Sequence, residues 1–81
     1  MPTVLREGPY RLYFYSSNGK EPAHVHVDRE QCSLKVWLDK VEVAHNIRFA
    51  PHEVREILKR VRQRQPELLK AWNEYFSADR R

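Results

Sequence analysis

The amino-acid sequence predicts an α+β fold, an antiparallel three- or four-stranded sheet followed by two C-terminal helices packed on one face. Apolar and polar residues alternate in short segments between about residues 9 and 45, which is the period of half-buried strands. From residue 51 onward the apolar residues recur every three or four positions, as on an amphipathic helix. At 81 residues we expect one domain, with helices over about 51–64 and 66–76 and a polar tail at 77–81.

Turn residues separate the expected strands. Gly8-Pro9 precedes the first strand, and the loop 17–22, which contains Asn-Gly and a proline, precedes the second. The segment from Cys32 to Asp39 alternates most cleanly and leads through a short hairpin turn to a last strand, in which Val41 and Val43 should face inward. The strands are expected at residues 10–16, 24–27, 32–39 and 41–44.

The helical part begins at Pro51, which suits the first position of a helix because its missing N–H costs nothing there. One kinked helix and two separate helices both fit the apolar pattern around Pro66. A proline in a helix interior costs ~3 kcal/mol, so two helices are favoured. The residues expected to be buried together are Leu34, Val36, Ile57, Leu58, Leu68 and Trp72.

The net charge of +4 is concentrated in one segment. Residues 55–64 carry five Lys or Arg residues against one Glu, which favours a polyanion such as RNA or an acidic protein partner. Arg55, Lys59 and Arg62 are the candidate contacts on this helix. No apolar run approaches the ~20 residues of a membrane helix, and the single Cys32 permits no disulfide within the chain. We therefore expect a cytoplasmic protein with no membrane contact and no cofactor.

Two histidines stand two residues apart in the stretch Glu21-Pro22-Ala23-His24-Val25-His26-Val27. On a strand His24 and His26 share one face, and the valines between them point to the other. The polar face should also carry aromatic and cationic side chains, which stack on bases and attract phosphates. An ordinary solvated strand face explains the same pattern. The candidates for nucleic-acid or partner binding on this face are Arg11, Tyr13, Tyr15, Lys35 and Trp37.

Three kinds of activity fit these residues. A metal-independent ribonuclease would use His24 and His26 as base and acid, with Arg48 among the cations available to stabilise the phosphorane. Alternatively the two histidines bind a metal with Asp28 or His45 as a third ligand, although two histidines alone fall short of the three or four ligands that zinc normally takes. The third possibility is a non-enzymatic module that binds a protein partner.

Several motifs carry a family likeness. They are the opening Met1-Pro2-Thr3-Val4-Leu5-Arg6, the histidine stretch, Trp37-Leu38-Asp39, and the closing Leu68-Leu69-Lys70-Ala71-Trp72-Asn73-Glu74-Tyr75-Phe76. Together they resemble a family of small bacterial proteins catalogued as a domain of unknown function, family 4160. The chain departs from that pattern at Ala23, where the family commonly has a second proline. The resemblance implies a gene beside that of another short protein, an arrangement similar to a toxin–antitoxin pair. Taken with the basic helix and the polar sheet face, this arrangement predicts a small basic module that acts on or binds RNA and has a small protein partner encoded nearby. The alternatives are a non-enzymatic module that binds a protein partner and a His-based metal-binding domain.

Overall fold

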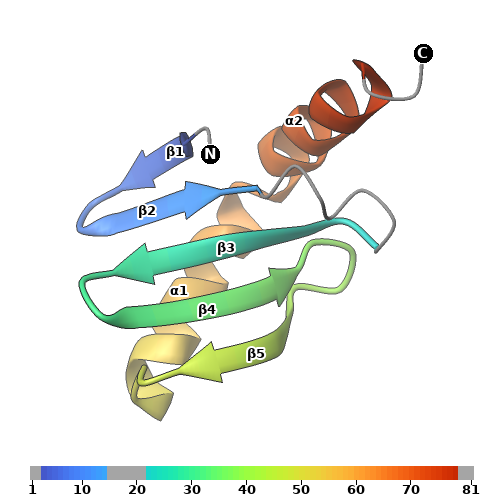
Figure 1. The fold of residues 1–81 in the computed structure, drawn as a ribbon. Coiled ribbons are helices and arrows are strands. Elements are labelled where there is room, and N and C mark those ends of the chain that lie inside the picture. The colour runs from blue at the N-terminus through green and yellow to red at the C-terminus, as the bar shows by residue number, and fades with distance from the viewer. Residues whose placement is uncertain (1–2, 15–21, 79–81) are drawn as a thin grey trace.

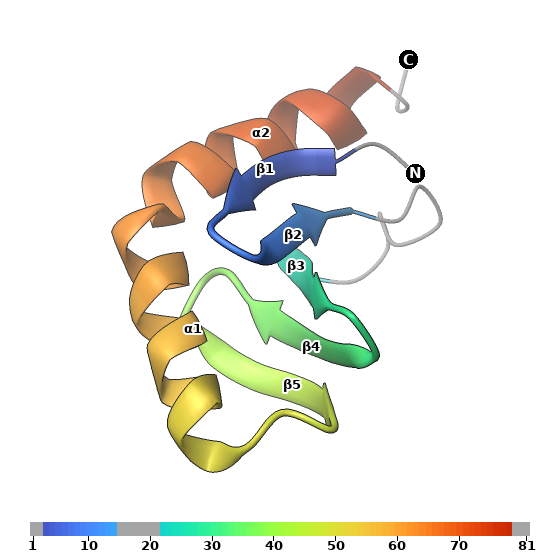
Figure 2. The same cartoon turned by 90° about the vertical axis from the view of Figure 1, so that its left-hand side faces the viewer.

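A five-stranded antiparallel sheet, in the order β1-β2-β3-β4-β5, forms one layer of the computed structural model, which describes residues 3–14 and 22–78. Both helices lie on the same side of this sheet, as Figures 1 and 2 show, and its other face carries no helix. The strands are β1 (Thr3–Glu7), β2 (Tyr10–Tyr13), β3 (His24–Arg29), β4 (Cys32–Trp37) and β5 (Glu42–Ile47), and the helices are α1 (Pro51–Gln63) and α2 (Gln65–Ala78). The predicted α+β class is confirmed, with five strands in place of three or four.

The first strand, β1, was not predicted. It pairs with β2 across the turn at Gly8, whose φ of +61° lies in the left-handed region that glycine adopts without a steric penalty. The sequence Thr-Val-Leu-Arg-Glu shows no period-two alternation, and the pairing register shifts between Thr3 and Leu5. Without that alternation the pairing partner, rather than the local pattern, decides that this segment is a strand.

The last strand, β5, differs from its prediction in both position and burial. Val41 is buried as expected, but it lies in the turn before β5, with a φ of +53° that is unusual for a β-branched residue. Val43 was expected to face inward, yet 38% of it is exposed. The reason is that β5 is an edge strand with a bulge, since Val43 pairs with Val36 whereas His45, not Ala44, pairs with Lys35.

The hydrophobic core fills the space between the sheet and the helices. The core side chains of β2, β3 and β4 alternate as predicted, and α1 buries Ile57 and Val61 against them. Leu58 is only partly buried, which corrects its assignment to the centre of the core. The remaining core residues from the two layers include Leu12, Phe14, Val25, Val27, Leu34, Val36, Leu38, Leu68, Trp72 and Phe76.

Two helices, rather than one kinked helix, follow the sheet. The N–H of Arg64 donates to the carbonyl oxygens of Arg60 and Val61 at 3.2 and 3.0 Å, which ends α1, and Pro66 occupies the second position of α2. The side-chain amide of Gln65 donates to the carbonyl oxygens of Leu38 and Asp39, at 2.6 and 2.9 Å. These bonds tie the corner between the helices to the β4–β5 turn. Neither α1 nor α2 combines the length and the apolar character that crossing a membrane requires.

A polar clamp fixes α1 on the sheet. The Nε and an Nη of Arg29 donate to the two carboxylate oxygens of Glu53 at 2.7 and 2.8 Å, and the hydroxyl of Tyr10 donates to Glu53 at 2.8 Å. The Arg29 guanidinium, followed by the Tyr10 hydroxyl, lowers the pKa of the Glu53 carboxyl below its ordinary value. Because the three residues come from β3, β2 and α1, the clamp joins both layers.

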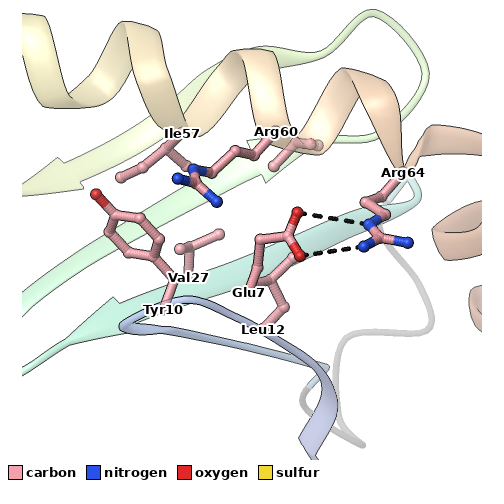
Figure 3. A pocket seen from close by; sticks show the side chains of 8 residues that line it. Glu7, Tyr10, Leu12, Val27, Ile57, Arg60 and Arg64 are labelled. Carbon is pink, nitrogen blue, oxygen red and sulfur yellow. Dashed lines mark hydrogen bonds and ion pairs between the residues drawn. The ribbon is translucent and has the colours of Figure 1, made fainter.

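Figure 3 shows a second polar contact between the layers, where Arg64 pairs with Glu7 of β1 at 3.3 Å. Arg60 reaches from α1 into the space between Tyr10 and Glu7. The cavity lined by these residues measures only about 10 Å³, which is about the space of one water molecule. It is therefore a packing gap of the α1–sheet interface and not a ligand site.

The core assignment predicts unequal costs for two neighbouring truncations. Ile57→Ala should lower the free energy of unfolding by ~2–5 kcal/mol, because Ile57 is fully buried and its loss leaves a cavity. Leu58→Ala should cost clearly less, since part of Leu58 is already in water. Urea unfolding of both variants measures the difference, and equal costs would contradict this orientation of α1.

The clamp predicts a pH-dependent contribution to stability. Glu53 has a lowered pKa in the folded protein, so its contribution is fully present above the ordinary value of 4.5 and is lost as the pH falls through the lower folded value. Glu53→Gln should therefore destabilise the protein at neutral pH, and the gap to the unaltered protein should narrow below pH 4.5. Unfolding curves between pH 3 and 7, about the range over which carboxylates titrate, measure this gap. A constant gap would argue against the ion pair.

Candidate functional site

The open face of the sheet carries a row of polar and aromatic side chains from four strands. The pairing register aligns Tyr13 with His26, His26 with Lys35, and Lys35 with His45. Residues directly opposite on neighbouring strands have Cβ atoms ~5 Å apart, so consecutive members of this row are neighbours. The structure thus places Tyr13 and Lys35 in this row, with Arg11 and Trp37 on the same side of the sheet. Tyr15, the remaining candidate, lies outside the described residues.

His24 is fully buried, which the alternation of β3 does not suggest. Its ring lies 5.0 Å from that of Trp72 on α2 and 5.5 Å from that of Trp37 on β4, between ring centroids. Nδ1–H donates to the carbonyl oxygen of Pro22 at 2.8 Å, which orients the imidazole. A side chain with no exposed surface meets no substrate in this conformation, so the first histidine of the motif is a structural residue that fixes the entry to β3.

His26 is half-buried and belongs to a connected polar cluster. Its ring stacks on that of Tyr13, with 5.3 Å between centroids and an interplanar angle of 19°, and meets the ring of His24 edge-on at 5.3 Å. The hydroxyl of Tyr13 donates to Asp28 Oδ2 at 2.9 Å. The guanidinium of Arg11 lies 4.8 Å from the centre of the Tyr13 ring. Tyr13 is consequently enclosed by its own neighbours, and only 3% of it is exposed.

Trp37, the second aromatic residue of this face, is covered in part by Lys35. Lys35 Nζ lies 4.8 Å from the centre of the Trp37 ring, within the range of a cation–π contact. Base stacking requires a free aromatic surface. Tyr13 offers none in this arrangement, and Trp37 is partly covered. The open face is therefore a poorer stacking platform than its composition predicts.

The sequence-predicted catalytic residues are not assembled. Arg48 follows Ile47, which pairs with Ser33, whereas His24 pairs with Trp37. Ser33 and Trp37 are four residues apart, which corresponds to about 13 Å along β4. Arg48 instead donates to the side-chain oxygen of Gln31 at 3.0 Å. It borders a surface hollow of about 490 Å³ at the β3–β4 turn, away from both histidines.

The metal-binding alternative finds no support in the geometry. Among residues 3–14 and 22–78, no three His, Cys, Asp or Glu side chains gather closely enough to hold a metal ion. Of the trio considered, His24 is buried against tryptophans, and one oxygen of Asp28 accepts the Tyr13 hydroxyl. The other, Oδ1, is buried and has no hydrogen-bond partner within the described part of the chain.

The outward basic residues of α1 lie on the opposite side of the molecule from the open face of the sheet. Ile57 and Val61 face the sheet, so Arg55, Lys59 and Arg62 point outward from α1, and all three are exposed. The predicted binding residues therefore form two separate surfaces. The first is the open sheet face with Arg11, Tyr13, Lys35 and Trp37, and the second, which we call the α1 cation surface, consists of Arg55, Lys59 and Arg62.

His45 is the residue of the open-face row that sequence reasoning missed as a binding candidate, having been considered only as a third metal ligand. Trp37 pairs with Glu42 and Val36 with Val43. If the hairpin continued regularly, Lys35 would pair with Ala44, but it pairs with His45. The bulge in β5 inserts one residue and turns His45 to the open face. No feature of the local sequence predicts this bulge.

The different environments of the histidines predict different effects of replacing them. His24→Ala should lower the free energy of unfolding by ~2 kcal/mol or more, because it leaves a cavity beside Trp72 and an unpaired Pro22 carbonyl. His45→Ala should change it by less than ~0.5 kcal/mol, since His45 is exposed. Denaturant unfolding compares the two variants, and a neutral His24→Ala would show that the imidazole is not part of the core.

Comparison with known proteins identifies one family. No curated protein and no solved structure matches the chain. The family model described as a domain of unknown function, DUF4160, matches residues 10–73, which include β2 to β5, α1 and most of α2. This match spans the histidine motif, the α1 cation surface and the core tryptophan Trp72, and on this basis the chain belongs to the DUF4160 family.

Proposed function

We propose that this protein is a small basic bacterial module that binds RNA through the α1 cation surface, as one half of a toxin–antitoxin-type pair. The observation that carries the RNA part is the distribution of charge on α1 and at its end. Of the five cations in residues 55–64, Arg60 reaches inward over Tyr10, and Arg64 pairs with Glu7 and Glu67. The other three make up the α1 cation surface.

The three outward cations are not used by the fold. No carboxylate of the described residues forms an ion pair with Arg55, Lys59 or Arg62, and their spacing places them along the exposed side of one helix. Unpaired cations on a rigid helix attract phosphates, and each phosphate neutralised releases counterions, which provides binding free energy. The surface would read charge and shape rather than base sequence.

The contacts of the open face support assigning RNA to α1 rather than to the sheet. Tyr13 is enclosed by Arg11 and His26, and Lys35 lies over Trp37, so these groups already satisfy one another. Among residues 3–14 and 22–78, the open face offers bases no unpaired stack of aromatic rings. A ribonuclease based on His24 is likewise disfavoured, because His24 is fully buried.

The toxin–antitoxin part of the proposal rests on the family likeness and requires a small protein partner encoded nearby. A second form of the proposed function is a module that binds an acidic protein through the α1 cation surface and does not bind RNA. Purification of the protein together with the product of the neighbouring gene tests the pairing. Failure of the two to co-purify at low salt would remove the toxin–antitoxin part while leaving RNA binding to be measured separately.

The α1 cation surface predicts a specific salt dependence for RNA binding. With three phosphate contacts, the logarithm of the affinity for single-stranded RNA should fall against the logarithm of salt with a slope of about −2. The triple variant Arg55→Gln, Lys59→Gln, Arg62→Gln should weaken binding by at least about tenfold at low salt and flatten this slope. Fluorescence anisotropy with a labelled oligonucleotide measures both quantities.

A matched triple variant controls for net charge. Arg6→Gln, Lys35→Gln, Lys40→Gln removes the same number of charges from positions outside α1, and it should leave most of the affinity intact. If this control loses affinity and the α1 variant does not, the RNA interface lies on the sheet and the proposal is wrong. Specific binding to an acidic protein without RNA affinity would favour the second form.

A further inference from the structure

The strand β5 lies at one edge of the sheet and is largely exposed. Five of its six residues are exposed, and Figure 1 shows β5 at the border of the sheet, opposite β1. The large apolar side chains that are exposed within the described residues, Val43 at 38% and Ile47 at 44%, both belong to this strand. A strand with unpaired backbone groups and exposed apolar side chains is a template for pairing with another strand.

The charges at the two ends of β5 identify the strand that fits. Glu42 begins β5 and borders a hollow of about 330 Å³ together with Asp39 and Lys40, a set with a net negative charge, whereas Arg48 directly follows β5 and borders the hollow at the β3–β4 turn. β5 therefore has an acidic start and a basic end. A second β5 running antiparallel brings each acidic start to the basic end of the other copy. We propose that this chain forms a two-fold symmetric dimer in which β5 pairs antiparallel with β5 of a second copy.

The bulge allows the two β5 strands to pair over their full length with their faces matched. Directly opposite residues of an antiparallel pair point to the same face. In β5, Glu42, His45 and Ile47 pair with residues of the open face, whereas Val43 and Asn46 pair with Val36 and Leu34 of the core side. The register that pairs all six residues of both copies places Glu42 opposite Ile47 and Val43 opposite Asn46 of the second copy, and it keeps these faces matched. In this register Arg48 lies next to Ile47 and so close to Glu42 of the second copy.

The dimer has a consequence for the proposed RNA-binding function, on which this step rests. A two-fold axis perpendicular to the joined sheet leaves the open faces together on one side and the helices together on the other. Figure 1 shows that α1 starts beside the end of β5. The two α1 cation surfaces therefore lie on the same side of one ten-stranded sheet, where one RNA strand contacts both. Three cations make a weak site, and two linked sites give an affinity well above that of either.

The first test measures mass without any RNA. Sedimentation velocity of the full chain should give twice the mass of the monomer at micromolar concentration. Ile47→Glu places like charges opposite each other at both ends of the strand pair and should weaken the dimer by about tenfold or more. The matched variant Ile47→Lys places opposite charges there and should retain the dimer, and the double variant Glu42→Lys, Ile47→Glu should restore it.

Each outcome of this test is decisive for the dimer. A monomeric unaltered protein at all concentrations, a dimer that is insensitive to Ile47→Glu, or equal effects of Ile47→Glu and Ile47→Lys would overturn the proposal. A monomer that adds a strand of another protein at β5 would also overturn it. Circular dichroism of each variant verifies that the fold is retained, and Ile47 is exposed enough for a charged side chain to be accommodated.

The second test separates the dimer from RNA binding. Ile47→Glu should lower the affinity for a long single-stranded RNA by at least about tenfold, whereas Asn73→Glu, the same charge change on the exposed side of α2, should not. A dimer that binds no RNA would refute the proposed function alone. Equal RNA affinity of the dimer and the Ile47→Glu monomer would refute the coupling of the two α1 surfaces.

Discussion

The packing of one helix pair on one face of the sheet is the interaction on which the rest of this structure depends. A chain of this length buries little apolar surface, so nearly all of it has to be placed between the two layers. The alternating residues of the strands and the apolar stripes of α1 and α2 meet in a single core. Glu53, held by Arg29 and Tyr10, adds a polar contact that fixes the rotation of α1 about its own axis.

That rotation determines the sidedness of the protein. Because Ile57 and Val61 face the sheet, the cations Arg55, Lys59 and Arg62 face solvent on the other side of α1. The open face of the sheet is occupied differently, since its aromatic rings and charged groups contact each other. The two surfaces thus have different capacities for new partners. The outward cations of α1 have no carboxylate partner among the described residues, whereas the charged groups of the open face largely contact other groups of that face.

The edge strand β5 forms a third surface. Natural edge strands are usually protected by charge, by bulges or by a covering element. β5 has a bulge, but it also carries the exposed Val43 and Ile47 between an acidic and a basic end. Such an arrangement is self-complementary in the antiparallel direction. Pairing of two copies through β5 would place both α1 cation surfaces on one side of the dimer. One RNA strand would then contact both surfaces.

The sequence by itself determined the fold class, the core alternation of β2 to β4 and the concentration of charge on α1, and it favoured a break between two helices near Pro66. These features are local, because a period of two or 3.6 residues is set by the backbone of each segment. Only the tertiary structure decided that Thr3–Glu7 is a strand, that a bulge turns His45 to the open face, that Trp72 buries His24, and that Arg48 lies far from both histidines. Strand register and the crossing of α2 over the sheet set these contacts, and both depend on residues distant in sequence that no local pattern specifies.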